Sequence, residues 1–211
     1  MDAMRVPTAL IDYGMGNLHS VGKALEQVGA TVELLDAPRE MERYRAVVLP
    51  GVGNFGDGVA QLTRRGFLPV LREWIEADRA FLGICLGMQL LLETSAEASG
   101  VRGLGVCKGR VARFAPSDAR LKVPQIGWNQ VFTRNGCPVF LGIPDGSHFY
   151  FVHSYYAAPE DASMIGGETD YGLRYCSVLW KGRMVATQFH PEKSQAVGLQ
   201  LLRNFMATVP A

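Results

Sequence analysis

The sequence predicts a three-layer α/β fold, in which a mixed, mainly parallel sheet carries helices on both faces and is extended by antiparallel hairpins. In the first half of the chain, short apolar runs alternate with longer segments of helical periodicity, as in a flavodoxin-like parallel sheet. In the second half, β-rich runs are separated only by short Gly, Asn or Pro breaks, which is typical of antiparallel strands at a sheet edge. Because no linker divides the chain, we expect residues 1–211 to form a single domain.

The first half contains four expected strands, at residues 8–12, 31–35, 46–49 and 80–84. Asn17 is suited to cap the first helix, because its side-chain oxygen can accept a backbone N–H, and Asp57 is suited to cap the next. Gly66 and Pro69 interrupt this second helical segment. A further helix is expected to begin over residues 88–93.

The second half contains expected strands at residues 111–114, 126–133, 147–156, 175–180 and 184–189. Lys181 and Gly182 are expected at the tip of a hairpin between the last two runs. A final helix begins at Ser194, with apolar residues recurring at helical spacing: Val197, Leu201 and Phe205.

Composition excludes several classes of protein. The 21 Lys and Arg residues nearly balance the 20 Asp and Glu residues, for a net charge of +1, which argues against a nucleic-acid-binding face or a polybasic membrane anchor. No apolar run approaches the roughly 18 residues of a membrane span, and the acidic start of residues 1–7 does not resemble a signal peptide. We expect no metal site, no disulfide framework and a cytoplasmic location, because the four cysteines are far apart: Cys85, Cys107, Cys137 and Cys176.

Cys85 lies in the segment GICLGMQ (residues 83–89), directly after an apolar strand and before a helical pattern. This is the nucleophile-elbow pattern with Cys in place of Ser. Flanking glycines permit a sharp turn, and a following helix start favours the thiolate and directs N–H groups at developing negative charge. A small buried hydrophobic residue in a tight turn is the alternative, and the glycines alone do not decide between the two.

His190 and Glu192 follow the last strand of the sequence and are two residues apart, on one side of an extended segment. The carboxylate is placed to fix the imidazole tautomer and to support its protonated form. By itself, His-Pro-Glu is a strand-ending turn with a solvated acid. Together with a cysteine at an elbow, it predicts a Cys-His-Glu triad.

A glycine-rich loop, PGVGNFG (residues 50–56), follows another apolar strand. Its glycines free backbone N–H groups to face a ligand. The loop lacks both the Gly-Lys-Ser/Thr and the G-x-G-x-x-G patterns of phosphate-binding loops. An oxyanion-binding loop is the favoured functional interpretation, and a simple turn before a helix is the structural one.

These three segments together resemble the motifs of class I, or triad, glutamine amidotransferases: GICLGMQ at residues 83–89, FHPEKS at 189–194 and PGVG at 50–53. Three further segments resemble the glutaminase subunits of imidazole glycerol phosphate synthases: DYGMGN at 12–17, PQIGWN at 124–129 and YFVHSY at 150–155. The resemblance spans residues 10–205. It departs at Gln125 and Ile126, where the pattern has His-Met, which concerns a partner contact and not the chemistry.

The resemblance implies a role for each matching residue and requires no cofactor. The implied catalytic residues are Cys85, His190 and Glu192, and the implied oxyanion hole comprises Gly51, Val52, Gly53 and Leu86. The implied contacts to the glutamine substrate are Gln89, Glu97, Ser154 and Tyr155. The implied partner interface comprises Met15, Asn17, Trp128, Tyr150 and Lys193.

The resemblance also implies a partner. Free ammonia is mostly protonated at neutral pH, and the chain is too short for a second catalytic domain, so the acceptor enzyme is expected to be a separate subunit. In the family it is a (β/α)8-barrel cyclase that makes imidazole glycerol phosphate and aminoimidazole carboxamide ribonucleotide in histidine biosynthesis. We expect a heterodimer with low activity of the isolated chain.

Three alternatives stay open at this point. One is a glutaminase of another ammonia-channelling synthase, such as those for pyridoxal phosphate, anthranilate or purines, against which the Gly-Trp-Asn segment argues. Another is a cysteine hydrolase that acts on a different acyl substrate. The third is a non-catalytic scaffold, which has no reason to keep all three triad residues.

Overall fold

The centre of the molecule is a parallel sheet, as predicted. The computed structural model describes residues 5–210, so the acidic start at residues 1–4 and residue 211 lie outside the described part. Five strands form the parallel core in the order β2-β1-β3-β4-β13. Their bounds are Val6–Ile11 (β1), Ala30–Leu35 (β2), Ala46–Leu49 (β3), Ala80–Ile84 (β4) and Met184–Thr187 (β13).

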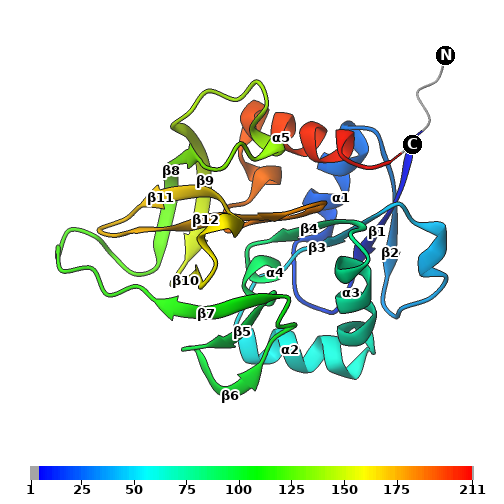
Figure 1. The fold of residues 1–211 in the computed structure, drawn as a ribbon, viewed down its shortest axis with the longest axis horizontal. Helices are drawn as coiled ribbons and strands as arrows, with labels where there is room; N and C mark the ends of the chain where they lie inside the picture. Colours follow the sequence, from blue (N-terminus) through cyan, green and yellow to red (C-terminus); the bar gives the residue numbers. More distant parts are fainter. Residues whose placement is uncertain (1–4, 211) are drawn as a thin grey trace.

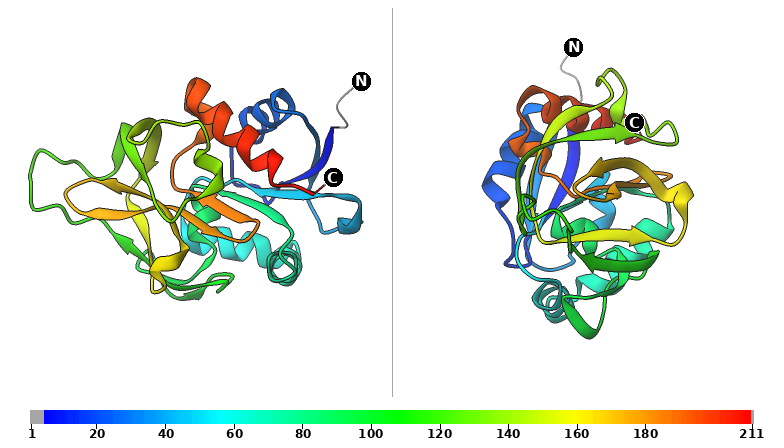
Figure 2. Two further views of the ribbon diagram at one scale, coloured as in Figure 1. Left: turned by 45° about the horizontal axis from the view of Figure 1, so that its top comes forward. Right: turned by 90° about the vertical axis from the view of Figure 1, so that its left-hand side faces the viewer.

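Helices cover both faces of this sheet (Figures 1 and 2), which confirms the three-layer prediction. One face carries α1 (Leu18–Gln27) and α5 (Gln195–Ala207). The other carries α2 (Phe55–Arg64), α3 (Phe67–Glu76) and the short α4 (Leu86–Gln89). The layers follow from the alternation of side chains along each strand.

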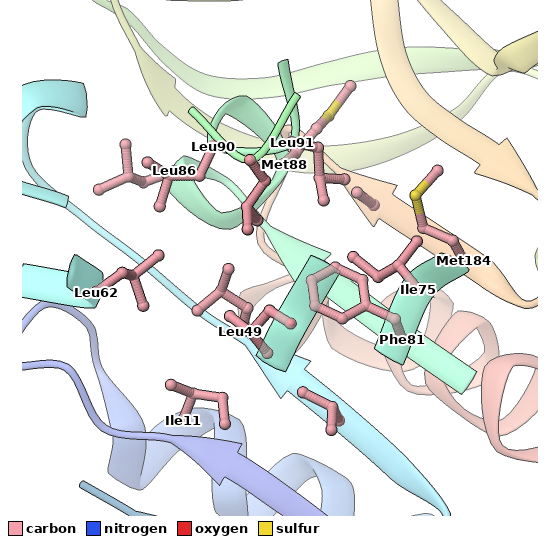
Figure 3. Packing of buried hydrophobic residues seen from close by; sticks show 14 of the residues in the cluster. Ile11, Leu49, Leu62, Ile75, Phe81, Leu86, Met88, Leu90, Leu91 and Met184 are labelled. Atoms are coloured by element: carbon pink, nitrogen blue, oxygen red, sulfur yellow. The ribbon is translucent and has the colours of Figure 1, made fainter. Parts of the chain in front are cut away.

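Neighbouring strand residues accordingly belong to two separate hydrophobic clusters. Ile11 and Leu49 face the α2/α3 layer together with Phe81 (Figure 3), whereas Leu10 and Val48 face the α1/α5 layer. Both sets are fully buried. The continuous apolar runs of these strands are explained by this burial on both faces.

Further strands extend the sheet beyond β13, and all of their pairings are antiparallel except that of β5 with β7. The order continues β12-β10-β7-β5-β6, and β11, β8 and β9 branch from β12. Their bounds are Leu92–Ser95 (β5), Ala98–Arg102 (β6), Cys107–Arg113 (β7), Gln125–Thr133 (β8), Ser147–His153 (β9), Tyr155–Pro159 (β10), Ile165–Asp170 (β11) and Arg174–Lys181 (β12). The β12–β13 hairpin turns after Lys181, as predicted. Single 3₁₀ turns occupy Met41–Arg43, Pro138–Phe140, Ala162–Met164 and Pro191–Lys193.

Two local predictions about helices were wrong. Asp57 does not cap α2, since the helix begins at Phe55 and the Asn54 side chain accepts the Asp57 backbone N–H at 2.8 Å. The helix expected over 88–93 ends at Gln89, and the next residues turn into β5, which pairs with β6 and β7. Pairing with the next two strands of the chain outweighed local helical periodicity there.

The run expected as one strand over residues 147–156 is divided. Ser154 separates β9 from β10, and each of these strands pairs with different neighbours: β9 with β8, and β10 with β7 and β12. The division places Ser154 in a bend and Tyr155 at the start of β10, where its carbonyl oxygen accepts a hydrogen bond from Gln89 of α4 at 3.0 Å. No helix within residues 5–210 has the length and apolar character that crossing a membrane requires.

Candidate active site

Cys85 occupies a strained turn between β4 and α4. Its φ of 55° and ψ of −106° fall where L-residues are rarely found, a conformation that persists only when surrounding packing holds it. The flanking glycines allow this packing, because a Cβ at Gly87 would collide with the Leu49 carbonyl oxygen and one at Gly83 would lie 2.9 Å from the Gly87 oxygen. Cys85 is 6% exposed.

His190 and Glu192 lie beside this turn because β13 is the parallel neighbour of β4, with Thr187 opposite Ile84. Residues that follow two adjacent parallel strands meet at the same edge of the sheet. His190 Nδ1 and Glu192 Oε1 are 2.8 Å apart, and the two side chains are 3% and 1% exposed. Since a carboxylate only accepts, Nδ1–H donates, and Nε2 is left with no hydrogen-bond partner among residues 5–210.

The electrostatics of His190 favour its charged form. Burial disfavours the imidazolium, but interactions with Cys85 and Glu192 outweigh burial and raise the pKa of His190 from 6.5 to about 10. His190 is therefore protonated at neutral pH. A protonated imidazole with an unpartnered Nε2 can donate a proton to a leaving group held at Cys85.

This raised pKa predicts a pH-dependent stability. Below pH 6.5 the imidazolium is present in both folded and unfolded chains and its stabilisation is complete; it is lost as pH rises toward the folded-state pKa of about 10. The difference in unfolding free energy between the wild type and His190→Gln should therefore shrink between pH 6.5 and 10. Denaturant titrations measure it, with His19→Gln, an exposed histidine on α1, as the control. If the difference in unfolding free energy between the wild type and His190→Gln grew with pH, the raised pKa of His190 would be contradicted.

Gln188 is a site residue that the sequence motifs did not single out. It is fully buried, its Nε2 lies 3.7 Å from the Cys85 sulfur, and its Oε1 accepts from Gln89 Nε2 at 3.1 Å. It thus connects the cysteine to the cavity residue Gln89. Its position in the segment QFHPE was the available signal, but polar residues at a strand end are common and only the fold directs this one to Cys85.

The glycine-rich loop does not present an open oxyanion hole. Leu86, whose N–H was implied as a hole donor, donates instead to the Gly51 carbonyl at 3.3 Å. The backbone N–H groups of Val52 and Gly53 make no hydrogen bond with the described residues, and Val52 is 42% exposed. Freeing the Leu86 N–H requires the Gly51–Val52 peptide to rotate. In the present conformation only glycine fits at position 51, because a Cβ there would collide with the Tyr13 hydroxyl.

A cavity of about 280 Å³ opens beside Cys85. Its lining includes all four residues implied for substrate binding: Gln89, Glu97, Ser154 and Tyr155. The Glu97 carboxylate accepts the Phe55 backbone N–H at 2.7 Å, so it is held in place and is not a solvated loop acid. Within residues 5–210, no group of three or more His, Cys, Asp or Glu side chains is placed to hold a metal ion.

Three of the five residues implied for the partner interface lie together. Trp128 on β8 faces Tyr150 on β9, with ring centroids 6.1 Å apart, and the Lys193 ammonium is 5.9 Å from the Tyr150 ring. We call Ile126, Trp128, Tyr150 and Lys193 the docking surface. Ile126 is 64% and Trp128 47% exposed, which is unusual for large apolar side chains.

The other two residues of the implied interface, Met15 and Asn17, lie between β1 and α1, and α1 contacts the Pro191–Lys193 turn. The Asn17 side chain caps α1 by accepting the Ser20 N–H at 3.2 Å, as predicted. The Met15 methyl group lies beside Gly53 in the glycine-rich loop. Met15 therefore links the β1–α1 turn to that loop.

The model of the family described as glutamine amidotransferase class-I matches residues 9–209. The chain belongs to the class-I glutamine amidotransferases. The "Imidazole glycerol phosphate synthase subunit HisH" of Syntrophotalea carbinolica is 50% identical over 202 residues, 93% of this chain and 97% of the relative. The protein of the same name from Geobacter sulfurreducens is 48% identical over 93% of this chain and 96% of its own length. This class-I amidotransferase thus groups with the HisH proteins.

Solved structures agree with the amidotransferase fold. PurLQS from Thermotoga maritima superposes with a TM-score of 0.74 at 16% identity, over 98% of each chain. A glutamine amidotransferase, also from Thermotoga maritima, superposes with a TM-score of 0.69 at 18% identity, over 99% of this chain and 100% of that one. At these identities the likeness concerns the fold alone.

Proposed function

We propose that the chain is the glutaminase subunit of an imidazole glycerol phosphate synthase. It hydrolyses glutamine to glutamate and ammonia and passes the ammonia to a (β/α)8-barrel cyclase subunit, which makes imidazole glycerol phosphate and aminoimidazole carboxamide ribonucleotide in histidine biosynthesis. The observation that carries the proposal is the hydrogen-bonded His190–Glu192 pair beside Cys85, at a cavity of amino-acid size. The similarity to the HisH subunits of imidazole glycerol phosphate synthases supports the choice of the partner. A cytoplasmic location forms part of the proposal.

The triad performs the hydrolysis in two steps. The Cys85 thiolate attacks the side-chain amide carbon of glutamine, and the protonated His190 gives its Nε2 proton to the amide nitrogen, which leaves as ammonia. The resulting neutral His190 then takes a proton from water, whose oxygen attacks the thioester. Glutamate leaves and the thiolate is restored. Glu192 keeps the imidazole oriented and supports its charge in both steps.

Substrate binding follows from the cavity lining. Gln89 and Glu97 contact the α-amino and α-carboxylate end of glutamine, helped by the backbone of Ser154 and Tyr155. The Glu97 carboxylate suits the ammonium, with which it can form a charge-assisted hydrogen bond. The length of the glutamine side chain then directs its amide toward Cys85.

The closed oxyanion hole explains a need for the partner. The tetrahedral intermediate carries a negative oxygen that the Leu86 N–H and the Gly51–Gly53 loop must stabilise. In the free chain the Leu86 N–H already donates a hydrogen bond to the Gly51 carbonyl. The cyclase is proposed to favour the rotated peptide when it binds the docking surface, which lies close to His190 through the Lys193 turn.

Glutamate release tests the proposal directly. The purified chain is assayed alone, with the cyclase, and with the cyclase together with its nucleotide ligand. A large rise on adding both, abolished by Cys85→Ala, is the expected result. If the rise fails to appear while Cys85 still reacts with an electrophilic glutamine analogue, the acceptor is another ammonia-channelling synthase. Equal turnover by the free chain and the complex would contradict the closed-hole explanation.

The docking surface makes a separate prediction. Trp128→Ala should weaken binding of the cyclase by roughly 10- to 100-fold, the usual loss for a central aromatic at an interface. Titration calorimetry or fluorescence anisotropy measures the dissociation constant. Leu34→Ala is the matched control, because Leu34 is also an exposed apolar residue, at 55%, but lies on β2 at the opposite edge of the sheet. Equal affinities of the wild type and Trp128→Ala would place the interface elsewhere.

A further inference from the structure

His153 is a buried histidine that takes no part in the proposed triad mechanism. It lines the cavity beside Ser154 and Tyr155 but is only 6% exposed. Aromatic rings surround it, with centroids of Phe114 at 5.3 Å and Phe151 at 5.6 Å. Burial and the nearby His190 lower the pKa of His153 to about 4, against a smaller opposing effect of its bond to Tyr155. The ring is therefore neutral at physiological pH.

The tautomer of this neutral ring is determined by its partners. His153 Nδ1 lies 2.7 Å from the Tyr155 carbonyl oxygen, which can only accept, so Nδ1 carries the proton. Nε2 is then an acceptor, and the Tyr175 hydroxyl lies 3.4 Å from it. This hydroxyl donates its single proton to Oε1 of Gln125, the first residue of β8, at 3.0 Å and is therefore not a donor to His153 Nε2. Among the described residues, His153 is thus held through its Nδ1–H, which donates to the Tyr155 carbonyl.

The Tyr155 carbonyl is shared between His153 and Gln89. Gln89 Nε2 donates to this carbonyl at 3.0 Å and to Gln188 Oε1 at 3.1 Å. Both amide protons of Gln89 are therefore used. Its Oε1 forms no hydrogen bond with the described residues and remains as an acceptor for the cavity that Gln89 lines.

We propose that His153 is a positioning residue for substrate binding: by holding the Tyr155 carbonyl, it fixes the Gln89 amide with Oε1 toward the cavity, where it accepts a hydrogen bond from the α-ammonium of glutamine. The inference rests on the proposed glutaminase function. A neutral ring suits this role, because it adds no positive charge near a cationic group of the substrate. A loss of the Nδ1–H would let the carbonyl shift and the amide turn.

Two alkylating probes of Cys85 separate this role from a merely structural one. A diazo-ketone analogue of glutamine carries the α-ammonium, whereas iodoacetamide does not. In His153→Phe, which keeps a planar ring but lacks the N–H, the rate of labelling by the analogue should fall about 10-fold relative to the iodoacetamide rate, the usual effect of losing a hydrogen bond to a charged group. In His153→Asn, whose amide N–H can replace Nδ1–H, the ratio should return toward that of the wild type.

The outcomes are distinct. In the complex, the KM for glutamine should rise in His153→Phe by a larger factor than kcat falls. An unchanged ratio of the two labelling rates would overturn the inference, whether neither rate changes or both fall by the same factor, as they do in a damaged fold. If iodoacetamide labels wild-type Cys85 but the analogue does not, the proposed function itself fails, and the inference with it.

Discussion

Cys85→Ala is expected to lose glutaminase activity by a factor of roughly 10⁴ or more, because removing a nucleophile leaves only the catalysis that binding supplies. The measurement is glutamate release by the complex with the cyclase, at saturating glutamine. The fold should be unaffected, since alanine fits the space of the thiol and the Cys85 sulfur forms no hydrogen bond with a backbone atom within residues 5–210; its long contact is with the Gln188 side chain.

Cys137→Ala is the matched control for this variant. Cys137 is equally buried, at 3% exposure, but lies at the Pro138–Phe140 turn near α5, away from the cavity. It should keep the wild-type rate, and it should still be labelled by the glutamine analogue. Appreciable turnover by Cys85→Ala would mean that another group attacks the amide, and the triad assignment would be wrong.

Glu192→Gln is the second large effect. The substitution preserves shape but removes the charge that, with Cys85, raises the pKa of the buried His190. Burial then favours the neutral imidazole, so the pKa of His190 should fall and less of the acid needed for ammonia release is present at neutral pH. Activity should drop by roughly 10²- to 10⁴-fold, the range seen when an orienting carboxylate of a triad becomes an amide.

The pH profile distinguishes this cause from general damage. The descending limb of kcat/KM on the alkaline side should move toward acid in Glu192→Gln, because it reports the loss of the His190 proton. Glu160→Gln, an exposed acid at the end of β10, serves as the control and should keep the wild-type profile. A reduced rate with an unshifted profile would assign Glu192 a role other than supporting the imidazolium.

Local sequence was sufficient where side-chain chemistry and short-range geometry decide the outcome. The parallel strands are nearly continuous apolar runs because both of their faces are buried. The elbow could be predicted because the turn requires glycine at positions 83 and 87, where β3 and α4 come too close to leave space for a Cβ. The Asn17 cap and the Lys181 hairpin were likewise local features.

Local sequence failed where strand pairing and packing beyond a short window decide the boundary of an element. The pattern after α4 predicts a longer helix over Leu90, Leu91 and Leu92. All three residues are fully buried, and the chain instead leaves α4 and forms β5, which pairs with β6 and β7. Asp57 has the chemistry of a helix cap, but the cap lies three residues earlier, at Asn54, where the loop after β3 ends. Such boundaries depend on packing that no short window contains.

By itself, the sequence determined the fold class, the family and the chemical groups available for a triad. The tertiary structure alone decided how these groups meet: the pairing of β4 with β13 brings Cys85 to His190, although the two are distant in the chain. It also decided that the Leu86 N–H donates to the Gly51 carbonyl. Only the folded chain places Gln188 and His153 in the candidate site. The physical reason is that backbone hydrogen bonds and the burial of polar side chains are satisfied between distant segments, so they appear only once the sheet has formed.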